Sequence, residues 1–165
     1  MSVVADILLS FRAPRAVLRR LAGGERREAR ILVYLMIACV LIFVAQWPRL
    51  ARVAHLDDAI PMEALLSGAL FGWVFVMPLF LYALAGLMAL VLRVVVRGAD
   101  AFAVRLALFW ALLVASLPAL LQGMVMGVIG PGLEATLTGG LVVVVFLAVL
   151  IAGLRTALEA PSVEA

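Results

Sequence analysis

The 165-residue sequence contains no lysine, one cysteine and one histidine, and only 14% of its residues are charged. Cys39 has no second cysteine with which to form a disulfide, and with His55 it is too little for a Cys/His metal site within one chain. All thirteen basic residues are arginines, which a GC-rich genome explains without reference to function. We therefore predict no metal and no cofactor, and we interpret Cys39 as an inert packing residue.

Long apolar stretches dominate what is present. Hydrophobic residues make up 67% of the chain, and the mean hydropathy of +1.25 exceeds that of an ordinary soluble domain. The longest stretch, residues 64–92, has 29 residues without a charge, and a helix of that length exceeds the roughly 30 Å core of a bilayer. The pattern predicts an all-α, polytopic membrane helical bundle. The net charge of +3 then reflects loops that face anionic lipid, not binding to nucleic acid.

Four spans are predicted within a single membrane domain, over residues 31–47, 66–92, 106–122 and 136–154. Trp47 and Pro48 mark the outer end of the first span, and residues 49–63 form a polar connection. Residues 123–132 are too rich in glycine and proline for a continuous helix and too apolar for an exposed loop. They predict a broken helix end or a loop that dips into the membrane. The tail, residues 156–165, is predicted to be disordered.

Residues 2–22 are predicted to form an amphipathic segment that lies in the membrane interface, because apolar side chains recur there at helical spacing with arginines between them. Pro14 divides this segment into two short helices, since its ring is tolerated in a first helical turn but not inside a helix. A signal peptide is the less favoured alternative. Asp6 interrupts the apolar run, and the arginines follow that run instead of preceding it.

The arginines predict the orientation of the chain. Eleven lie before the first span, between the second and third spans or after the fourth, against two elsewhere, so both termini are expected to be cytoplasmic. Those near the amino terminus are also expected to bind anionic lipid head groups, each contributing about 1 kcal/mol, with a role in topology alone as the alternative. The residues concerned are Arg12, Arg15, Arg19, Arg20, Arg26 and Arg27.

The spans lack the groups that membrane chemistry usually requires. No acidic, basic or histidine residue occurs within residues 31–48, 64–92, 106–133 or 135–154. Ion-coupled transporters place such groups inside the membrane, and a hydroxyl nucleophile needs a partner base. His55, Asp57 and Asp58 fit no established motif and are interpreted as part of a solvated loop. We therefore predict neither an enzyme nor a self-sufficient transporter, and no catalytic residue.

Small residues and prolines give the clearest positive signals within the spans. Glycines four positions apart let helices approach closely, either within the bundle or against a partner. Pro78 and Pro118 are predicted to kink their helices or to serve as hinges. The glycines predicted to pack helices are Gly68, Gly72, Gly123 and Gly127.

Three stretches, residues 13–43, 71–87 and 105–132, resemble the Yip (Ypt-interacting protein) family of membrane proteins in its small alphaproteobacterial form. The resemblance implies a compact helical bundle in the bacterial inner membrane with a cytoplasmic amino terminus. Eukaryotic relatives associate with small GTPases in membrane traffic, a partner that is not expected in a bacterium. The larger family commonly has five hydrophobic segments, whereas four are counted in this chain.

The combined pattern favours a non-enzymatic integral membrane protein that acts as a scaffold, membrane-organising or assembly factor through helix packing and contact with anionic lipid. One alternative is an accessory subunit of a larger transport or energy-transducing complex, in which a partner supplies the ionisable groups that the spans lack. Another is a small oligomeric channel or transporter, for which the serines, threonines and Gln122 provide little polar lining. The expected partners are membrane lipids and either another integral membrane protein or a second copy of the chain.

Overall fold

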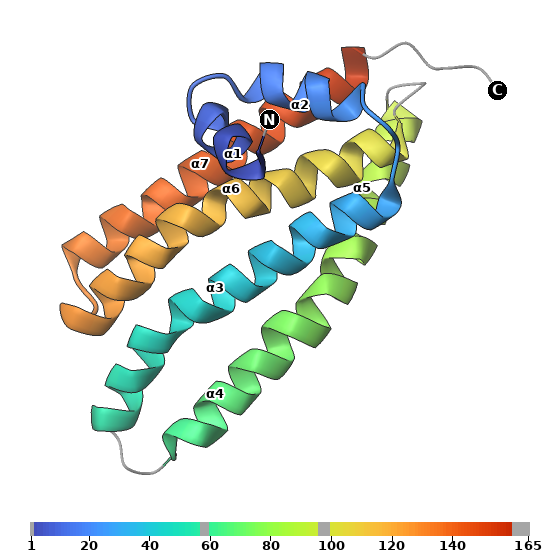
Figure 1. Ribbon diagram of the computed structural model, residues 1–165. Coiled ribbons are helices and arrows are strands. Elements are labelled where there is room, and N and C mark those ends of the chain that lie inside the picture. The colour runs from blue at the N-terminus through green and yellow to red at the C-terminus, as the bar shows by residue number, and fades with distance from the viewer. Residues whose placement is uncertain (1, 57–59, 96–99, 160–165) are drawn as a thin grey trace.

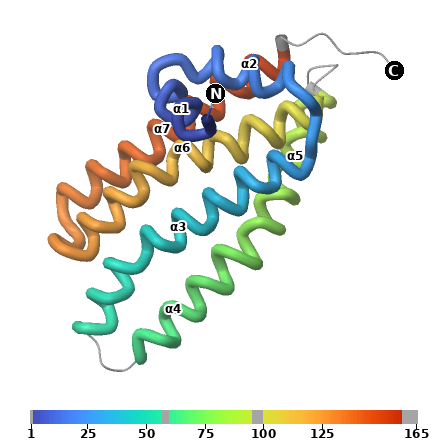
Figure 2. Tube along the Cα trace, viewed as in Figure 1, coloured from blue at the N-terminus to red at the C-terminus, as the bar shows by residue number. Residues whose placement is uncertain are grey.

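The computed structural model describes residues 2–56, 60–95 and 100–159, and these residues are almost wholly helical. Two short helices come first, α1 (Val3–Ser10) and α2 (Pro14–Ala22). Long helical segments then run back and forth beside one another (Figure 1, Figure 2). They are built from α3 (Glu28–Leu56), α4 (Met62–Phe71), the π-helix η1 (Gly72–Val76), α5 (Met77–Val95), α6 (Ala101–Val128) and α7 (Leu133–Glu159).

Within the described ranges, four helical segments are long and apolar enough to cross a membrane, and no strand occurs. These segments are Glu28–Leu56, Met62–Val94, Ala101–Val128 and Leu133–Leu158. Each extends beyond both ends of the corresponding predicted span. The predicted fold class, an all-α membrane bundle with four spanning helices that follow a short amphipathic region, is therefore confirmed.

α6 is the central helix of the bundle. It packs along α3 on one side and along α7 on the other (Figure 1). Most residues of its apolar stretch are buried, whereas few are buried in the second and fourth spanning segments. Those two segments therefore present most of their apolar side chains to the surroundings, as helices in contact with lipid do.

α3 and α6 approach closely where small residues face each other. A Cβ atom built on Gly123 would overlap the backbone carbonyl of Ala45, and one built on Gly127 would overlap Pro48. A glycine on α7 has a similar role, because a Cβ atom on Gly153 would lie 2.6 Å from the Cβ of Ala107 in α6. The structure thus places Gly123 and Gly127 at a contact within the chain, where only a missing side chain permits the observed separation.

The first spanning helix is longer than predicted. α3 continues past Pro48 to its end at Leu56, so Arg49 and Arg52 belong to a helix and not to a polar connection. Nη1 of Arg52 donates hydrogen bonds to the carbonyls of Gly127 (3.3 Å) and of the next residue (3.2 Å) at the end of α6. Contacts with α6 on both sides of the proline therefore hold α3 on its course, although Pro48 itself removes one helical hydrogen bond.

The break predicted within residues 123–132 occurs only in the last four of them. α6 runs without interruption to Val128, so that most of the glycine-rich stretch is helical. The turn to α7 is confined to residues 129–132, in which Gly130 has a φ of +97°. This left-handed conformation favours glycine, which explains the sharp reversal there. α7 includes residues 156–159 of the tail predicted to be disordered, and residues 160–165 lie outside the described residues.

The second spanning segment contains a π-helical turn beside its proline. The N–H of Met77 bonds to the carbonyl of Gly72, five residues back, and Pro78 follows directly. A proline ring crowds the preceding turn and supplies no N–H, and a wider turn relieves that crowding. The irregularity expected at Pro78 is therefore located in η1, whereas the helical pattern of α6 is unbroken at Pro118.

Candidate functional site

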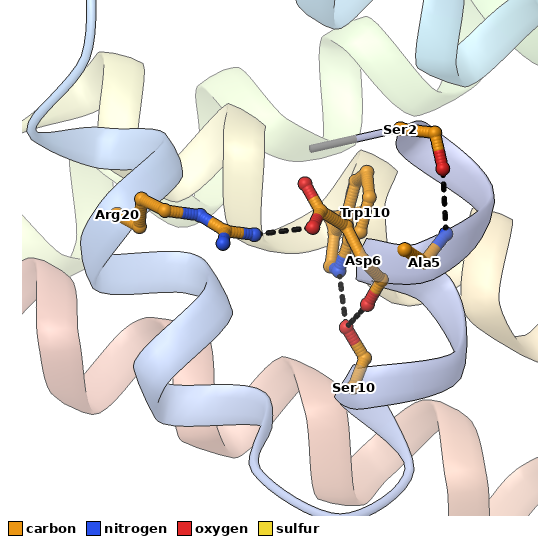
Figure 3. A network of polar contacts seen from close by, with 6 residues as sticks. All are labelled: Ser2, Ala5, Asp6, Ser10, Arg20 and Trp110. Carbon is orange, nitrogen blue, oxygen red and sulfur yellow. Dashed lines mark hydrogen bonds and ion pairs between the residues drawn. The ribbon is translucent and has the colours of Figure 1, made fainter.

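A buried polar network attaches α1 to the bundle (Figure 3). The hydroxyl of Ser10 donates to the backbone carbonyl of Asp6 at 2.7 Å and accepts a hydrogen bond from Nε1 of Trp110 at 2.9 Å. The carboxylate of Asp6 pairs with the guanidinium of Arg20 on α2. Asp6 is 6% exposed and Ser10 is 1% exposed. The polar face of α1 therefore points into the protein.

The apolar face of α1 points outward as a consequence. Val4, Leu8 and Phe11 are 65%, 61% and 46% exposed. In α2 the arrangement is the opposite, because its apolar residues Val17 and Leu18 are fully buried, and this helix packs on α7. The sequence predicted one apolar stripe facing the membrane along both helices, but only α1 presents such a stripe.

Aromatic rings surround the anchor point of α1. Trp110 is fully buried, and its ring meets that of Tyr34 from α3 edge to face at a centroid distance of 5.0 Å. The adjacent Phe109 makes the same type of contact with Tyr82 of α5 at 4.9 Å. These rings come from three spanning segments, so the position of α1 is coupled to the packing of the whole bundle at this end.

The six arginines predicted to contact lipid differ in whether they have a partner within the chain. Three form ion pairs within the chain: Arg20 with Asp6, Arg26 with Asp100 at 2.9 Å, and Arg27 with Glu25 at 2.8 Å. Arg19 is exposed and also makes an interaction within the chain. Arg12 and Arg15 are exposed and have no hydrogen-bond or ion-pair partner among the described residues. Head groups can therefore reach these two without competition from a partner in the described part of the chain.

Further ion pairs tie the start of α3 to the start of α6. Asp100 caps α6 by accepting from the backbone N–H of Phe102 at 3.0 Å, and its second oxygen accepts from Arg26. The guanidinium of Arg26 also lies 5.9 Å from the centroid of the Phe102 ring. Arg105 of α6 pairs with Glu28 of α3. Part of the basic charge at this end of the bundle is therefore neutralised internally.

A second region lies in the half of the bundle away from α1. A partly open cavity of about 400 Å³ is lined by residues of α3, η1, α6 and α7, and we call it the Trp73 cavity after the indole on η1 that lines it. Most of its lining is apolar, and Gln46, Arg49 and Gln122 add polar groups. Nη1 of Arg49 donates to Oε1 of Gln46 at 3.4 Å. The size and the few polar groups are typical of pockets that bind small ligands.

The other glycine pair lies on the outside of the chain. A Cβ atom built on Gly68 or Gly72 would meet nothing within 4 Å. The neighbouring rings of Phe71 and Phe75 are 63% and 65% exposed and stack on each other with centroids 5.8 Å apart. Unlike Gly123 and Gly127, this pair packs against no helix within the described part of the chain.

Groups suited to metal binding do not gather in the described ranges, where no three His, Cys, Asp or Glu residues lie close enough together to hold an ion. His55 lies in the last turn of α3 and is exposed, and Asp57 and Asp58 lie outside the described residues. Cys39 is fully buried in the hydrophobic core.

Sequence reasoning missed both the anchoring network and the Trp73 cavity. The spacing of Asp6 and Ser10, four residues apart on one helical face, was an available signal for the first. The cavity had no comparable signal, because its lining residues come from four separate elements.

The fold defines a multi-pass integral membrane protein. No family model, curated protein or solved structure matches the chain. The resemblance to the Yip family therefore stays a prediction, and the function is argued from the geometry alone.

Proposed function

We propose that the protein is a non-enzymatic, membrane-organising scaffold or assembly factor of the bacterial inner membrane, whose α1 segment binds anionic lipid on the cytoplasmic side. The observation that carries this proposal is the outward apolar face of α1, formed by Val4, Leu8 and Phe11. It is followed directly by Arg12 and Arg15, which are exposed and have no partner among the described residues. Apolar side chains that enter the acyl region next to cations that meet head groups are the usual design of an interfacial helix.

The depth of α1 in the bundle supports this reading. α6 has 28 residues and is therefore about 42 Å long, roughly 12 Å more than the hydrocarbon core of a bilayer. Trp110, which binds Ser10, lies about 14 Å from the start of α6. With α6 centred in the bilayer, the hydrocarbon core begins about 6 Å along the helix, so the contact between Ser10 and Trp110 lies about 8 Å inside it, within the depth that the apolar face of an interfacial helix reaches. The buried network holds its apolar side chains outward before lipid binds, so little ordering entropy is lost on binding.

Lipid analysis after extraction tests the proposal. The full chain is extracted from its membrane in polymer-bounded discs, and the anionic fraction of the co-extracted lipid is compared with that of the bulk membrane. We expect enrichment that the double variant Arg12→Gln/Arg15→Gln reduces, with apparent affinity falling about fivefold for each arginine at about 1 kcal/mol. Arg93→Gln is the matched control, because Arg93 is an exposed arginine in the last turn of α5. The absence of enrichment, or an equal loss in the control, would contradict the proposal.

A second candidate function is that of an accessory subunit in a larger membrane complex. The open face around Gly68 and Gly72 favours it, because no helix of the described chain covers these glycines and a partner helix can approach them closely. Mass spectrometry of proteins in the same discs distinguishes the two functions. A partner at fixed stoichiometry that is lost in Gly68→Ile/Gly72→Ile, but retained in Gly86→Ile, supports the subunit. Gly86 suits this control because it is equally open.

A further inference from the structure

We infer that the Trp73 cavity binds one acyl chain of an anionic phospholipid, with the lipid phosphate held by Arg49. This site lies in the opposite half of the bundle from α1 and is independent of the function proposed above. The inference rests on three properties of the cavity: its depth along the helices, the apolar character of its walls, and the charge at one end.

The cavity lies within the membrane-spanning part of the bundle. Its lining on α6 runs from Leu112 to Met126, from about 16 Å to about 37 Å along a helix of about 42 Å. On α3 it runs from Ile42 to Arg49. The surrounding solvent over most of this length is hydrocarbon, so an apolar chain is the ligand available to fill the space.

Small residues on α6 create the space, and larger apolar residues border it. Ala115, Ala119 and Gly123 lie along the α6 side, and Val142 and Phe146 of α7 form part of the facing wall. An apolar cavity of about 400 Å³ without an occupant leaves its walls without contact partners, which costs dispersion energy. A flexible acyl chain restores these contacts without requiring a hydrogen bond.

The π-helical turn η1 supplies the remaining wall. It displaces the chain from regular α-helical spacing just before Pro78, and Trp73 on this turn lines the cavity. Turns of this type recur at functional sites, because they redirect a side chain that a regular helix would place elsewhere. Its indole offers a large apolar surface to an acyl chain and one N–H that can donate a hydrogen bond.

The positive charge of Arg49, at the end of the Trp73 cavity, indicates the kind of head group that the site binds. Arg49 lies about 27 Å along α3 from Ile31, near the second interface of a bilayer whose core begins at Ile31. Among the described residues its one hydrogen-bond partner is Gln46, at 3.4 Å, and its side chain is exposed, so its remaining donors are available to a ligand. Arg52, one turn further on, is already engaged with carbonyls at the end of α6. Guanidinium and phosphate form short, paired hydrogen bonds, so Arg49 is the residue suited to a phospholipid phosphate.

Fluorescence quenching by brominated lipid tests the inference, because Trp73 lies in the wall of the site. The full chain is placed in liposomes of phosphatidylcholine that contain a minor fraction of phosphatidylglycerol with brominated acyl chains. A second set contains the same fraction of brominated phosphatidylcholine instead. The signal of Trp73 is obtained as the difference between the natural chain and Trp73→Phe, which separates it from Trp47 and Trp110.

We expect brominated phosphatidylglycerol to quench Trp73 more strongly than brominated phosphatidylcholine does. Arg49→Gln reduces this preference about tenfold, as expected for the loss of a hydrogen bond to a charged group. Arg49 is exposed, so this variant leaves the fold intact. Arg93→Gln, at the opposite end of the bundle, leaves the preference unchanged.

Filling the cavity provides the second variant. Ala119→Phe places a ring in the site and abolishes the preferential quenching, whereas Ala83→Phe on the exposed surface of α5 does not. Equal quenching by the two lipids overturns the inference, as does a preference that survives Arg49→Gln. A chain that is dimeric in these liposomes and becomes monomeric only in Ala119→Phe also overturns it, because a second copy then occupies the cavity. We expect Arg12→Gln/Arg15→Gln to leave the quenching of Trp73 unchanged. The experiment therefore tests the Trp73 cavity separately from the lipid site proposed at α1.

Discussion

Trp110 and Ser10 are one hundred positions apart, yet the indole Nε1 of Trp110 donates a 2.9 Å hydrogen bond to the Oγ of Ser10. Both side chains are at most 1% exposed. A buried indole N–H without an acceptor is destabilising by the full free energy of its desolvation. The bond to Ser10 therefore favours the orientation in which this face of α1 turns inward. α1 is therefore held against the bundle by its polar face, and its apolar face is left free to contact lipid.

Ser10→Ala removes the acceptor and leaves the indole N–H of Trp110 buried without a partner. We expect the free energy of unfolding to fall by about 1–3 kcal/mol, measured by thermal or denaturant unfolding in mild detergent. Ser67→Ala is the control, because the hydroxyl of Ser67 is exposed and donates only to a carbonyl of its own helix. A loss no larger than that of the control would show that the contact carries no stability.

Asp6→Asn weakens the ion pair that joins α1 to Arg20 of α2. Because the side chain of Arg20 is 42% exposed, we expect a local effect of about 1 kcal/mol and about fivefold faster amide exchange in residues 3–10. Hydrogen exchange measured by mass spectrometry reports this directly. Glu25→Gln breaks an ion pair with Arg27 in which both side chains are exposed, and it leaves exchange in α1 unchanged. Equal exchange in the two variants would contradict the anchoring role.

Gly123→Ala and Gly68→Ala separate a glycine that packs within the chain from one that does not. At Gly123 the added methyl overlaps the carbonyl of Ala45, so α3 and α6 are forced apart at a cost of about 1–3 kcal/mol or more. At Gly68 the methyl meets nothing, and the higher helix propensity of alanine makes the change neutral or slightly stabilising. Unfolding of the two variants under the same conditions measures the difference. Similar losses would mean that the close contact of α3 and α6 contributes no stability.

The spanning helices could be predicted from the sequence because their signal is local. Each of the four predicted spans is an uncharged run long enough to cross a bilayer, and the structure has a helical segment over each of them. Their ends were less predictable. Pro48 and the stretch from Gly123 to Gly132 both indicate a break when considered alone. In the folded chain Pro48 of α3 packs directly against Gly127 of α6. The missing side chain of the glycine makes room for the proline, and both helices continue through this contact.

The candidate sites depended on contacts that no local pattern contains. Asp6 appeared to be an interruption of an apolar run, and its role became visible only when Ser10 of the same face met Trp110 of α6. Six arginines appeared equivalent in the sequence, but internal carboxylates engage some of them, and Arg12 and Arg15 have no such partner among the described residues. Long-range pairing therefore decides which charges are available to lipid.

Cysteine labelling tests the predicted orientation, on which the side of each lipid site depends. Glu25 precedes α3 and Glu63 lies in the first turn of α4, and both are exposed. The starts of α3 and α4 lie at opposite ends of the bundle (Figure 1). In intact bacteria we expect a membrane-impermeant maleimide to label Glu63→Cys but to label Glu25→Cys only after lysis, because eleven of thirteen arginines favour a cytoplasmic amino terminus. Cys39 is fully buried and remains unlabelled in both variants, which makes the natural chain the control. The reverse labelling pattern would place α1 in the outer leaflet and Arg49 in the inner one. Each proposed site would then bind lipid from the leaflet opposite to the one expected here.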